Sequence, residues 1–413
     1  MPPIPNPAHD ARHADRHALR DALVDARRRT LATFAAYEAG LAQSGLAVPY
    51  SAQLNPPLWE LGHVGWFQDW WIARNPQRAL GAAADPDAAR VAPRRSGVDA
   101  MFDSGRIAHR DRWALALPSP DALRDDLMQG LQQTLALLDA IDDSDARDAA
   151  LYFFRLCLFH EDMHHEAAVY MAQHLDLALA GRGPDAHPAS ASIALPAVQH
   201  VSGAPETGFA FDNELGRHAV ELAAFEIDAA PVTWGAYLRF VEAGGYETRC
   251  CWSDDGWAWL QAQGLHAPRY LRRHGDLWQR RGFGNWADVD AALPAMNLSC
   301  FEAEAWCAWA GRRLPTEAEW ESAAERGGDG HAWGQVWEWT ASTFAPYPDF
   351  APHPYRDYSQ PWFGTRRVLR GGSFATHARM KHVRYRNFYT PDRNDIYAGF
   401  RTCAADASPA AAR

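Results

Sequence analysis

The sequence predicts an α+β protein made of a helical bundle followed by an irregular domain of short strands, turns and few helices. In residues 10–182, apolar side chains recur at the three- and four-residue spacing of amphipathic helices. Residues 183–192 consist mainly of Gly, Pro, Ala and Ser, a composition typical of a linker. In residues 193–405 the helical period fades, and glycines and turn residues become frequent. We therefore expect two domains, 10–182 and 193–405.

Four long amphipathic segments in the first half predict an antiparallel four-helix bundle. We expect these helices at residues 15–44, 56–74, 119–138 and about 144–180. The third begins with a serine N-cap followed by proline at the first helical position, which is a typical helix start. The arginine-rich segment 81–117 is expected to be a loop, and long loops in compact domains are often functional.

The second half carries helical periodicity in three short segments, at residues 233–244, 301–311 and 315–325. Short strands and glycine-rich tight turns are expected between them. The sequence has no repeat of fixed period that would indicate a solenoid or a propeller. We therefore expect a loop-rich α+β domain.

The composition indicates a globular protein that acts on small molecules. The 413 residues include 47% hydrophobic and 22% charged ones, and the formal net charge is -11. A nucleic acid or an anionic membrane would require a basic face, so we expect neither as a partner. The six cysteines form no CxxC pair, the N-terminal segment is polar, and no apolar run reaches the length of about 18 residues that spans a bilayer. We expect free thiols and a cytoplasmic location, and the sequence leaves the oligomeric state open.

Two histidines in the fourth predicted helix have the spacing of metal ligands. His160 and His164 are four residues apart, so both imidazoles leave one face of the helix about one turn apart. Their neighbours are largely leucine, phenylalanine and alanine, which indicates a buried face and argues against solvated histidines. The spacing suits iron, zinc, copper or nickel. Glu166 is expected to accept a hydrogen bond from a ligating ring and to fix its tautomer.

A third histidine, His63, lies in an apolar and aromatic stretch of the second predicted helix. Taken alone, such a residue is more often a hydrogen-bonded core histidine than a ligand. In a bundle whose facing helices converge inward, it becomes the expected third donor for an ion held by the pair. Three histidines with open positions suit hydrolytic zinc or oxygen-activating iron, and residue chemistry leaves that choice open.

The chain resembles a known family along nearly its whole length. The pattern His160-x3-His164-x-Glu166 with the upstream His63 is similar to the DinB-like bundle domain of the ergothioneine-pathway sulfoxide synthases. The second half resembles their C-terminal domain, which has the C-type-lectin-like fold of the formylglycine-generating (sulfatase-modifying) enzymes. The motifs that carry this likeness are Pro231-Val-Thr and residues 306–321, 334–339, 370–373 and 399–401.

This resemblance implies chemistry at C2 of the imidazole of hercynine, to which the family joins a chalcogen with iron(II) and dioxygen. His63, His160 and His164 match the iron ligands of the family. Tyr355 matches a tyrosine that delivers a proton or a hydrogen atom, a role that suits a phenol with one transferable O–H. Tyr358 matches a second tyrosine beside it. Without the resemblance, a loop tyrosine is more commonly a packing residue.

The segment Arg386-Asn387-Phe388-Tyr389 matches the wall of the hercynine pocket in this family. The resemblance implies that Asn387 contacts the polar end of hercynine and that an aromatic face attracts the trimethylammonium group. Arg393 matches an arginine that holds a carboxylate of the thiol substrate. An ordinary surface ion pair is the alternative interpretation of this arginine.

Three departures from the family pattern concern substrate binding. Met163 stands where relatives often carry a glutamine that holds hercynine, and methionine donates no strong hydrogen bond. Tyr389 stands where some relatives bind the amine of γ-glutamylcysteine with an aspartate. The loop 101–113 lacks the tyrosine-rich segment whose spaced arginines clamp the carboxylates of the peptide. Its candidate donor-binding residues are Arg106, His109, Arg112 and Trp113.

These departures favour the branch of the family that makes selenoneine, in which the donor is a selenosugar. A neutral polyol stacks on aromatic faces and needs neutral hydrogen bonds, so it gains nothing from a charged clamp. A structured loop with solvated arginines is an equally good interpretation of the four loop residues. On balance we expect C–Se bond formation with a selenosugar.

Three other functions remain open at this point. The chief alternative is an ergothioneine-type sulfoxide synthase that couples hercynine with cysteine or γ-glutamylcysteine. A zinc-dependent DinB-type thiol transferase would contain zinc and take up no oxygen. A non-enzymatic protein, with a ligand-binding second half and the bundle as a scaffold, would keep its function after His160→Ala.

Overall fold

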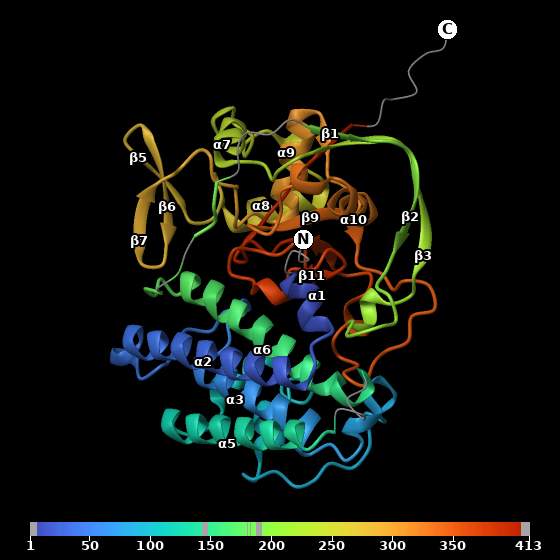
Figure 1. Cartoon of the computed structure of the whole chain (residues 1–413). Coiled ribbons are helices and arrows are strands. Elements are labelled where there is room, and N and C mark those ends of the chain that lie inside the picture. The colour runs from blue at the N-terminus through green and yellow to red at the C-terminus, as the bar shows by residue number, and fades with distance from the viewer. Residues whose placement is uncertain (1–5, 143–147, 180, 182, 187–191, 406–413) are drawn as a thin grey trace.

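The computed structural model describes residues 6–142, 148–179, 181, 183–186 and 192–405. A bundle of long helices lies against one side of a domain of short strands and helices, and α6 (Asp148–His174) lies at the boundary between them (Figure 1). The predicted fold class, a helical bundle followed by an α+β domain, is confirmed. Among the described residues, no helix combines the length and the apolar character needed to cross a membrane.

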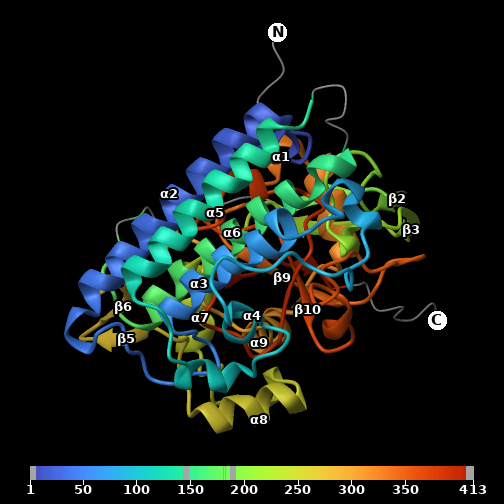
Figure 2. The same ribbon diagram turned by 90° about the horizontal axis from the view of Figure 1, so that it is seen from below.

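Four helices form the bundle, close to the predicted segments. They are α2 (Arg16–Gly40), α3 (Pro57–Gln68), α5 (Pro120–Asp139) and α6. Ser119 caps α5, because its side chain accepts a hydrogen bond from the backbone N–H of Ala122, as the N-cap pattern predicts. Seen from below, these helices lie side by side across the second domain (Figure 2).

Three helix ends differ from the prediction, and the first of them is that of α2, which ends at Gly40 and is followed by a 3₁₀ turn at Ala42–Ser44. The second predicted helix changes at Asp69–Ala73 into a wider π-helical turn, and α6 ends at His174 rather than near residue 180. Residues 144–147 and residue 180 of the fourth predicted helix lie outside the described residues. Short helical elements occur before the bundle and in the predicted loop, namely α1 (Pro7–Arg12), α4 (Val98–Phe102) and 3₁₀ turns at Arg78–Ala83 and His109–Ala114.

Short strands build the described part of the second domain. They are β1 (Ser192–Leu195), β2 (Val198–Ser202), β3 (His218–Leu222), β4 (Phe225–Asp228), β5 (Leu271–His274), β6 (Leu277–Gly282), β7 (Asn285–Asp288), β8 (Arg312–Arg313), β9 (Trp337–Thr343), β10 (Arg367–Arg370), β11 (Asn387–Tyr389), β12 (Ala398–Gly399) and β13 (Cys403–Ala404). Two four-stranded sheets have the orders β1-β4-β13-β8 and β11-β10-β9-β12. The pair β2-β3 and the meander β5-β6-β7 project beside them (Figure 1).

The helices of this domain are α7 (Trp234–Glu242), α8 (Asp254–Gln263), α9 (Cys300–Ala310) and α10 (Glu317–Arg326). Three of them coincide with predicted segments, and α8 was missed. With a glycine, Gly256, in its first turn and few buried residues, α8 shows little apolar periodicity. The available signal was Ser253, whose side chain caps the helix.

The strand β11 determines which side chains can face the bundle. It pairs antiparallel with β10, with Phe388 opposite Val368. Successive side chains of a strand point to opposite faces, so Phe388 points away from the side on which Asn387 and Tyr389 lie. Its ring stacks on Phe344 with a centroid distance of 4.0 Å.

Buried polar contacts and a shared apolar core join the two domains. Arg12 forms a bidentate pair with Glu214, at 2.6 and 2.8 Å between nitrogen and oxygen. On α6, Asp162 accepts hydrogen bonds from Arg29 of the bundle and, at 2.6 Å, from Arg379 of the second domain. Buried apolar residues of both halves form one continuous cluster. The domain boundary is therefore packed like an interior, and α6 is fixed on both sides.

Candidate metal centre

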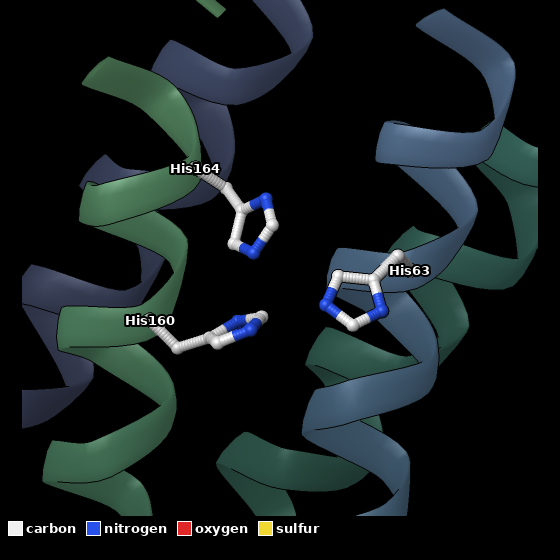
Figure 3. A group of neighbouring side chains, drawn as sticks. All are labelled: His63, His160 and His164. Atoms are coloured by element: carbon white, nitrogen blue, oxygen red, sulfur yellow. The ribbon is translucent and has the colours of Figure 1, made fainter. Parts of the chain in front are cut away.

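Three histidine rings converge in the bundle, His63 from α3 and His160 and His164 from α6 (Figure 3). One nitrogen from each ring can be chosen so that all three lie within 4.8 Å of one another. The ring centroids are 4.4 Å apart for the pair on α6, and 5.1 and 4.8 Å from that of His63. His63 and His160 are buried, and His164 is half-buried. The structure thus brings together the three histidines that the sequence singled out.

The hydrogen bonds of the rings leave three nitrogens free to bind an ion. Nδ1 of His63 lies 2.8 Å from the carbonyl oxygen of Phe102, and a carbonyl only accepts, so Nδ1 donates and Nε2 keeps its lone pair. Nδ1 of His164 lies 2.6 Å from Oε2 of Glu60, which leaves its Nε2 free in the same way. Nε2 of His160 is buried and has no hydrogen-bond partner in the described chain. An unsatisfied buried nitrogen costs about 1–3 kcal/mol, which a metal ion would offset.

The electrostatics of the site favour neutral, metal-binding imidazoles. Burial and then repulsion from His164 lower the pKa of His63 to about 3. The same two causes lower the pKa of His160 well below its usual value. Burial alone would raise the pKa of Glu60, but His164, together with His63 and Asn55, outweighs it and the pKa falls to about 2. The rings of His63 and His160 are therefore neutral at pH 7, and the carboxylate of Glu60 lies behind the third ring, a donor set that fits a divalent transition metal.

The predicted role of Glu166 is wrong. Its carboxylate accepts hydrogen bonds from Trp337 Nε1 at 2.8 Å, Ser373 Oγ at 2.6 Å and Thr376 Oγ1 at 2.7 Å, all from the second domain. Glu166 follows His164 by two residues, which places it about 200° away around the helix. Glu60 of α3 accepts the hydrogen bond from the His164 imidazole instead. That residue precedes His63 by three positions, so the one-turn spacing was the signal that could have identified it.

The two predicted tyrosines lie beside the histidines. The ring of Tyr355 packs edge-on against Phe67 at 4.9 Å, and Phe67 stacks on His160 at 3.5 Å between centroids. The centroids of Tyr355 and His160 are 6.4 Å apart. Tyr358 lies 5.9 Å from Tyr355, and its hydroxyl points to the sulfur of Met163 at 3.8 Å. Burial raises the pKa of Tyr355, so its phenol is protonated at neutral pH.

A cavity between α6 and β11 is lined by three of the predicted substrate-binding residues, Met163, Asn387 and Tyr389. Phe388 lies on the opposite face of β11 and is not part of its wall. The sequence analysis missed the other side chains of this wall, which are mainly aromatic or acidic. They include Tyr170, Trp337, Tyr385, Asp162 and Glu166. Tyr385 directly precedes the segment matched to the hercynine pocket, which was a usable signal.

Arg393, which is half-buried, lies at the edge of this region and pairs with the buried Asp395. Its Nε and Nη2 donate to the two carboxylate oxygens of Asp395 at 2.5 and 2.7 Å. Its guanidinium also lies 4.9 Å from the ring centroid of Tyr389. Asp395 therefore already neutralises the charge that was predicted to hold a substrate carboxylate.

Three of the four loop residues predicted to bind the donor attach the loop to residues 48–55, and the fourth, Arg106, bonds within the loop. Arg106 forms an exposed ion pair with Asp103 at 3.0 Å. His109 bonds to the carbonyl of Leu54 at 2.8 Å, and Trp113 donates to that of Val48 at 3.0 Å. Arg112 donates to Oδ1 of Asn55 at 2.8 Å. Arg106 therefore lies in an ion pair of its own, whereas the ring centroids of His109 and Trp113 are 5.3 Å apart, and donor binding by these residues stays a prediction.

A second cavity, of ≈ 250 Å³, adjoins Tyr355. One wall is aromatic and consists of Trp66, Phe67, Trp70 and Trp71. The polar side chains are mostly acidic, namely Asp87, Asp103 and Asp357, with Ser104 and Arg356. Arg356 pairs with Asp87 at 3.0 Å, so carboxylates dominate the charge of this cavity.

Comparison with known proteins gives consistent matches for both halves. Residues 22–168 match the DinB superfamily, and residues 184–335 and 331–406 match the sulfatase-modifying factor enzyme 1-like domain. Hercynine oxygenase from Mycolicibacterium thermoresistibile is 32% identical over 92% of this chain and 92% of its own length. The hercynine oxygenase of Mycobacterium tuberculosis is 32% identical over 86% and 92%. Formylglycine-generating enzyme from Streptomyces coelicolor is 31% identical over 56% of this chain and 94% of its own.

Proposed function

This chain belongs to the hercynine oxygenase family, the ergothioneine-pathway sulfoxide synthases, and we propose that it couples hercynine to a chalcogen donor with dioxygen at a mononuclear iron(II) held by His63, His160 and His164. The observation that carries this proposal is the buried, unpartnered Nε2 of His160 beside two imidazoles whose Nδ1 atoms are already engaged. Iron(II) bound there would supply the one-electron chemistry that dioxygen requires. Zinc would fit the same three nitrogens, but an oxygenase needs a redox-active ion.

We assign hercynine to the cavity between α6 and β11. Its aromatic walls suit a trimethylammonium group, which binds to ring faces through cation–π attraction. Glu166 adds a carboxylate whose hydrogen bonds come from neutral donors. Burial raises the pKa of Glu166, and a bound cation would lower it again and favour the charged form. Met163, which lines the same cavity, directly precedes His164, so the cavity borders the turn of α6 that carries a metal-binding histidine.

Tyr355 is the proposed donor of a proton or a hydrogen atom. Its phenol lies beside Phe67 and His160, and burial keeps it protonated. Tyr358 supports this position through its contact with the Tyr355 ring and through its hydroxyl, which lies 3.4 Å from that of Tyr385. Both tyrosines thus connect the metal centre with the hercynine cavity.

The similarity to the relatives supports sulfur as the chalcogen that this protein couples to hercynine. The two hercynine oxygenases match this chain over most of its length, which supports an ergothioneine-type reaction with cysteine or γ-glutamylcysteine. This reaction is therefore our main proposal, in place of the C–Se bond formation that the loop sequence favours.

One observation keeps a selenosugar as the second candidate donor. The cavity beside Tyr355 presents three carboxylates and one guanidinium, and Arg393 is already paired with Asp395. A donor that carries carboxylates would be repelled there, whereas a neutral polyol would find aromatic walls and hydrogen-bond acceptors.

The test uses iron-loaded protein that has been purified without oxygen. It is given hercynine and dioxygen with γ-glutamylcysteine, cysteine or a 1-selenosugar in parallel, and the products are identified by mass. A sulfur adduct supports the main proposal, and a selenium adduct alone supports the second. Oxygen uptake without any hercynine adduct, or full activity with zinc and no oxygen uptake, would contradict both.

A further inference from the structure

The segment made of α4 and the loop that follows it packs against α3 and contacts His63 of the metal centre. Its backbone accepts two hydrogen bonds from α3, from Trp59 Nε1 to the carbonyl of Met101 at 2.8 Å and from His63 Nδ1 to that of Phe102 at 2.8 Å. The loop continues over the 3₁₀ turn His109–Ala114. The orientation of the His63 ring therefore depends on a segment that itself contributes no metal-binding residue.

Arg112, in this turn, reaches His63 through a tryptophan. Its guanidinium carbon lies 3.9 Å from the ring centroid of Trp59. The Trp59 ring in turn stacks on the imidazole of His63 at 4.8 Å, with an angle of 10° between the planes. A cation over an indole face contributes about 0.5–2 kcal/mol. The three groups form a stack that restricts rotation of the His63 ring.

Arg112 also reaches His164, through hydrogen bonds. It donates to Oδ1 of Asn55, the amide nitrogen of Asn55 donates to Glu60, and Glu60 accepts from His164 Nδ1 at 2.6 Å. An amide can be turned either way, and only one orientation presents its NH₂ to a carboxylate. Because Arg112 only donates, it fixes the amide oxygen of Asn55 on its own side and the NH₂ on the side of Glu60.

We propose that Arg112 is a positioning residue that fixes two of the three metal-binding imidazoles, His63 and His164, from outside the site. The inference rests on the proposed metal centre but not on the identity of the substrates. It gives Arg112 a different role from the donor binding that the loop sequence suggested. Partners that orient metal ligands typically contribute 10- to 100-fold in metal affinity.

The test measures the affinity of metal-free, full-length protein for Co²⁺ and the visible spectrum of the bound ion, which reports ligand geometry. Arg112→Gln is expected to weaken Co²⁺ binding about tenfold and to change the spectrum. Arg110→Gln is the matched control, because Arg110 lies in the same loop over the ring of Tyr50, at 5.0 Å, and Tyr50 packs against His109 and Trp113, neither of which is one of the three converging histidines. It is expected to leave both readouts unchanged.

A second variant tests the proposed route. Asn55→Ala is expected to weaken Co²⁺ binding as well, and the double variant with Arg112→Gln to weaken it by less than the product of the two separate effects. If Arg112→Gln fails to fold, unchanged Co²⁺ affinity and spectrum in Asn55→Ala overturn the route to His164. Unchanged affinity and spectrum in folded Arg112→Gln, with a raised KM for the chalcogen donor, overturn the inference and return Arg112 to substrate binding. Normal Co²⁺ binding without hercynine turnover would contradict the proposed function alone.

Discussion

The polar groups on the two sides of α6 differ in whether they have hydrogen-bond partners. On the bundle side, His160 has a buried nitrogen with no partner in the described chain, and it lies beside His63 and His164. On the side of the second domain, Glu166 accepts three hydrogen bonds and Asp162 is held by arginines of both domains. Buried polar groups are normally satisfied. The first side is therefore arranged for a metal ion, whereas on the second side both carboxylates have hydrogen-bond partners that fix the helix in place.

This comparison separates two carboxylates that each lie within three residues of a ligand in sequence, Glu60 three before His63 and Glu166 two after His164. Glu60 accepts a hydrogen bond from an imidazole, whereas Glu166 accepts from an indole and two hydroxyls of the other domain. Whether a carboxylate orients a metal ligand or stabilises the contact between the domains depends on its hydrogen-bond partner. Its distance from a ligand along the chain does not decide this. The predictions below test this division, beginning with the largest expected effect.

Removal of a ligand is expected to abolish function. His160→Ala leaves two imidazoles, so the protein should lose its iron and turn over no faster than the metal-free protein. His165→Ala is the matched control, because its ring bonds to Thr33 at 3.0 Å and is not one of the three converging rings. Iron content per chain and oxygen uptake measure the effect. Full iron occupancy in His160→Ala would show that the bundle side is not the metal site.

Tyr355, beside the metal centre, is expected to affect turnover but not the binding of iron or hercynine. Tyr355→Phe removes one O–H and keeps the ring against Phe67, so turnover should fall about 10²- to 10⁴-fold. Iron content and hercynine affinity, the latter measured by calorimetry, should stay the same. A loss of hercynine affinity that accounts for the whole effect would make Tyr355 a binding residue instead.

The two carboxylates are expected to respond differently to the same substitution. Glu60→Gln should weaken metal binding about 10- to 100-fold, because the carboxylate that orients His164 is replaced by an amide. Glu166→Gln should leave metal affinity unchanged and lower the free energy of unfolding by about 1–3 kcal/mol, because its NH₂ would face donors. Chelator competition and urea unfolding separate the two effects. If Glu166→Gln weakened metal binding as strongly, the division between the two sides of α6 would be wrong.

A smaller effect is expected from acid. The pKa of His63 falls from 6.5 in the unfolded chain to about 3 in the folded one. Between these values the unfolded state binds a proton that the folded state lacks, so stability of the metal-free protein decreases as the pH falls. One such group contributes a slope of up to about 1.4 kcal/mol per pH unit. Urea unfolding at pH 7, 6 and 5 should show a shallower slope for His63→Gln, and an unchanged slope would refute this assignment.

The sequence identified those site residues whose placement depends on regular helix geometry. The spacing of His160 and His164 fixes their common face, and the apolar surroundings of His63 indicate that it points inward. The roles of Glu166 and of the loop arginines could not be predicted, because they depend on which groups of other segments lie opposite them. For Arg112 the decisive partners, Trp59 and Asn55, lie on or just before α3, far away in the sequence.

The most direct test of the account is the X-ray absorption spectrum at the iron edge of active, iron-loaded protein. We expect a single iron ion with scattering from three imidazoles and from additional light-atom ligands that are not protein side chains. His160→Ala should lose this signal. A centre whose coordination is filled entirely by protein side chains, or full activity in protein that contains zinc and no iron, would contradict the account.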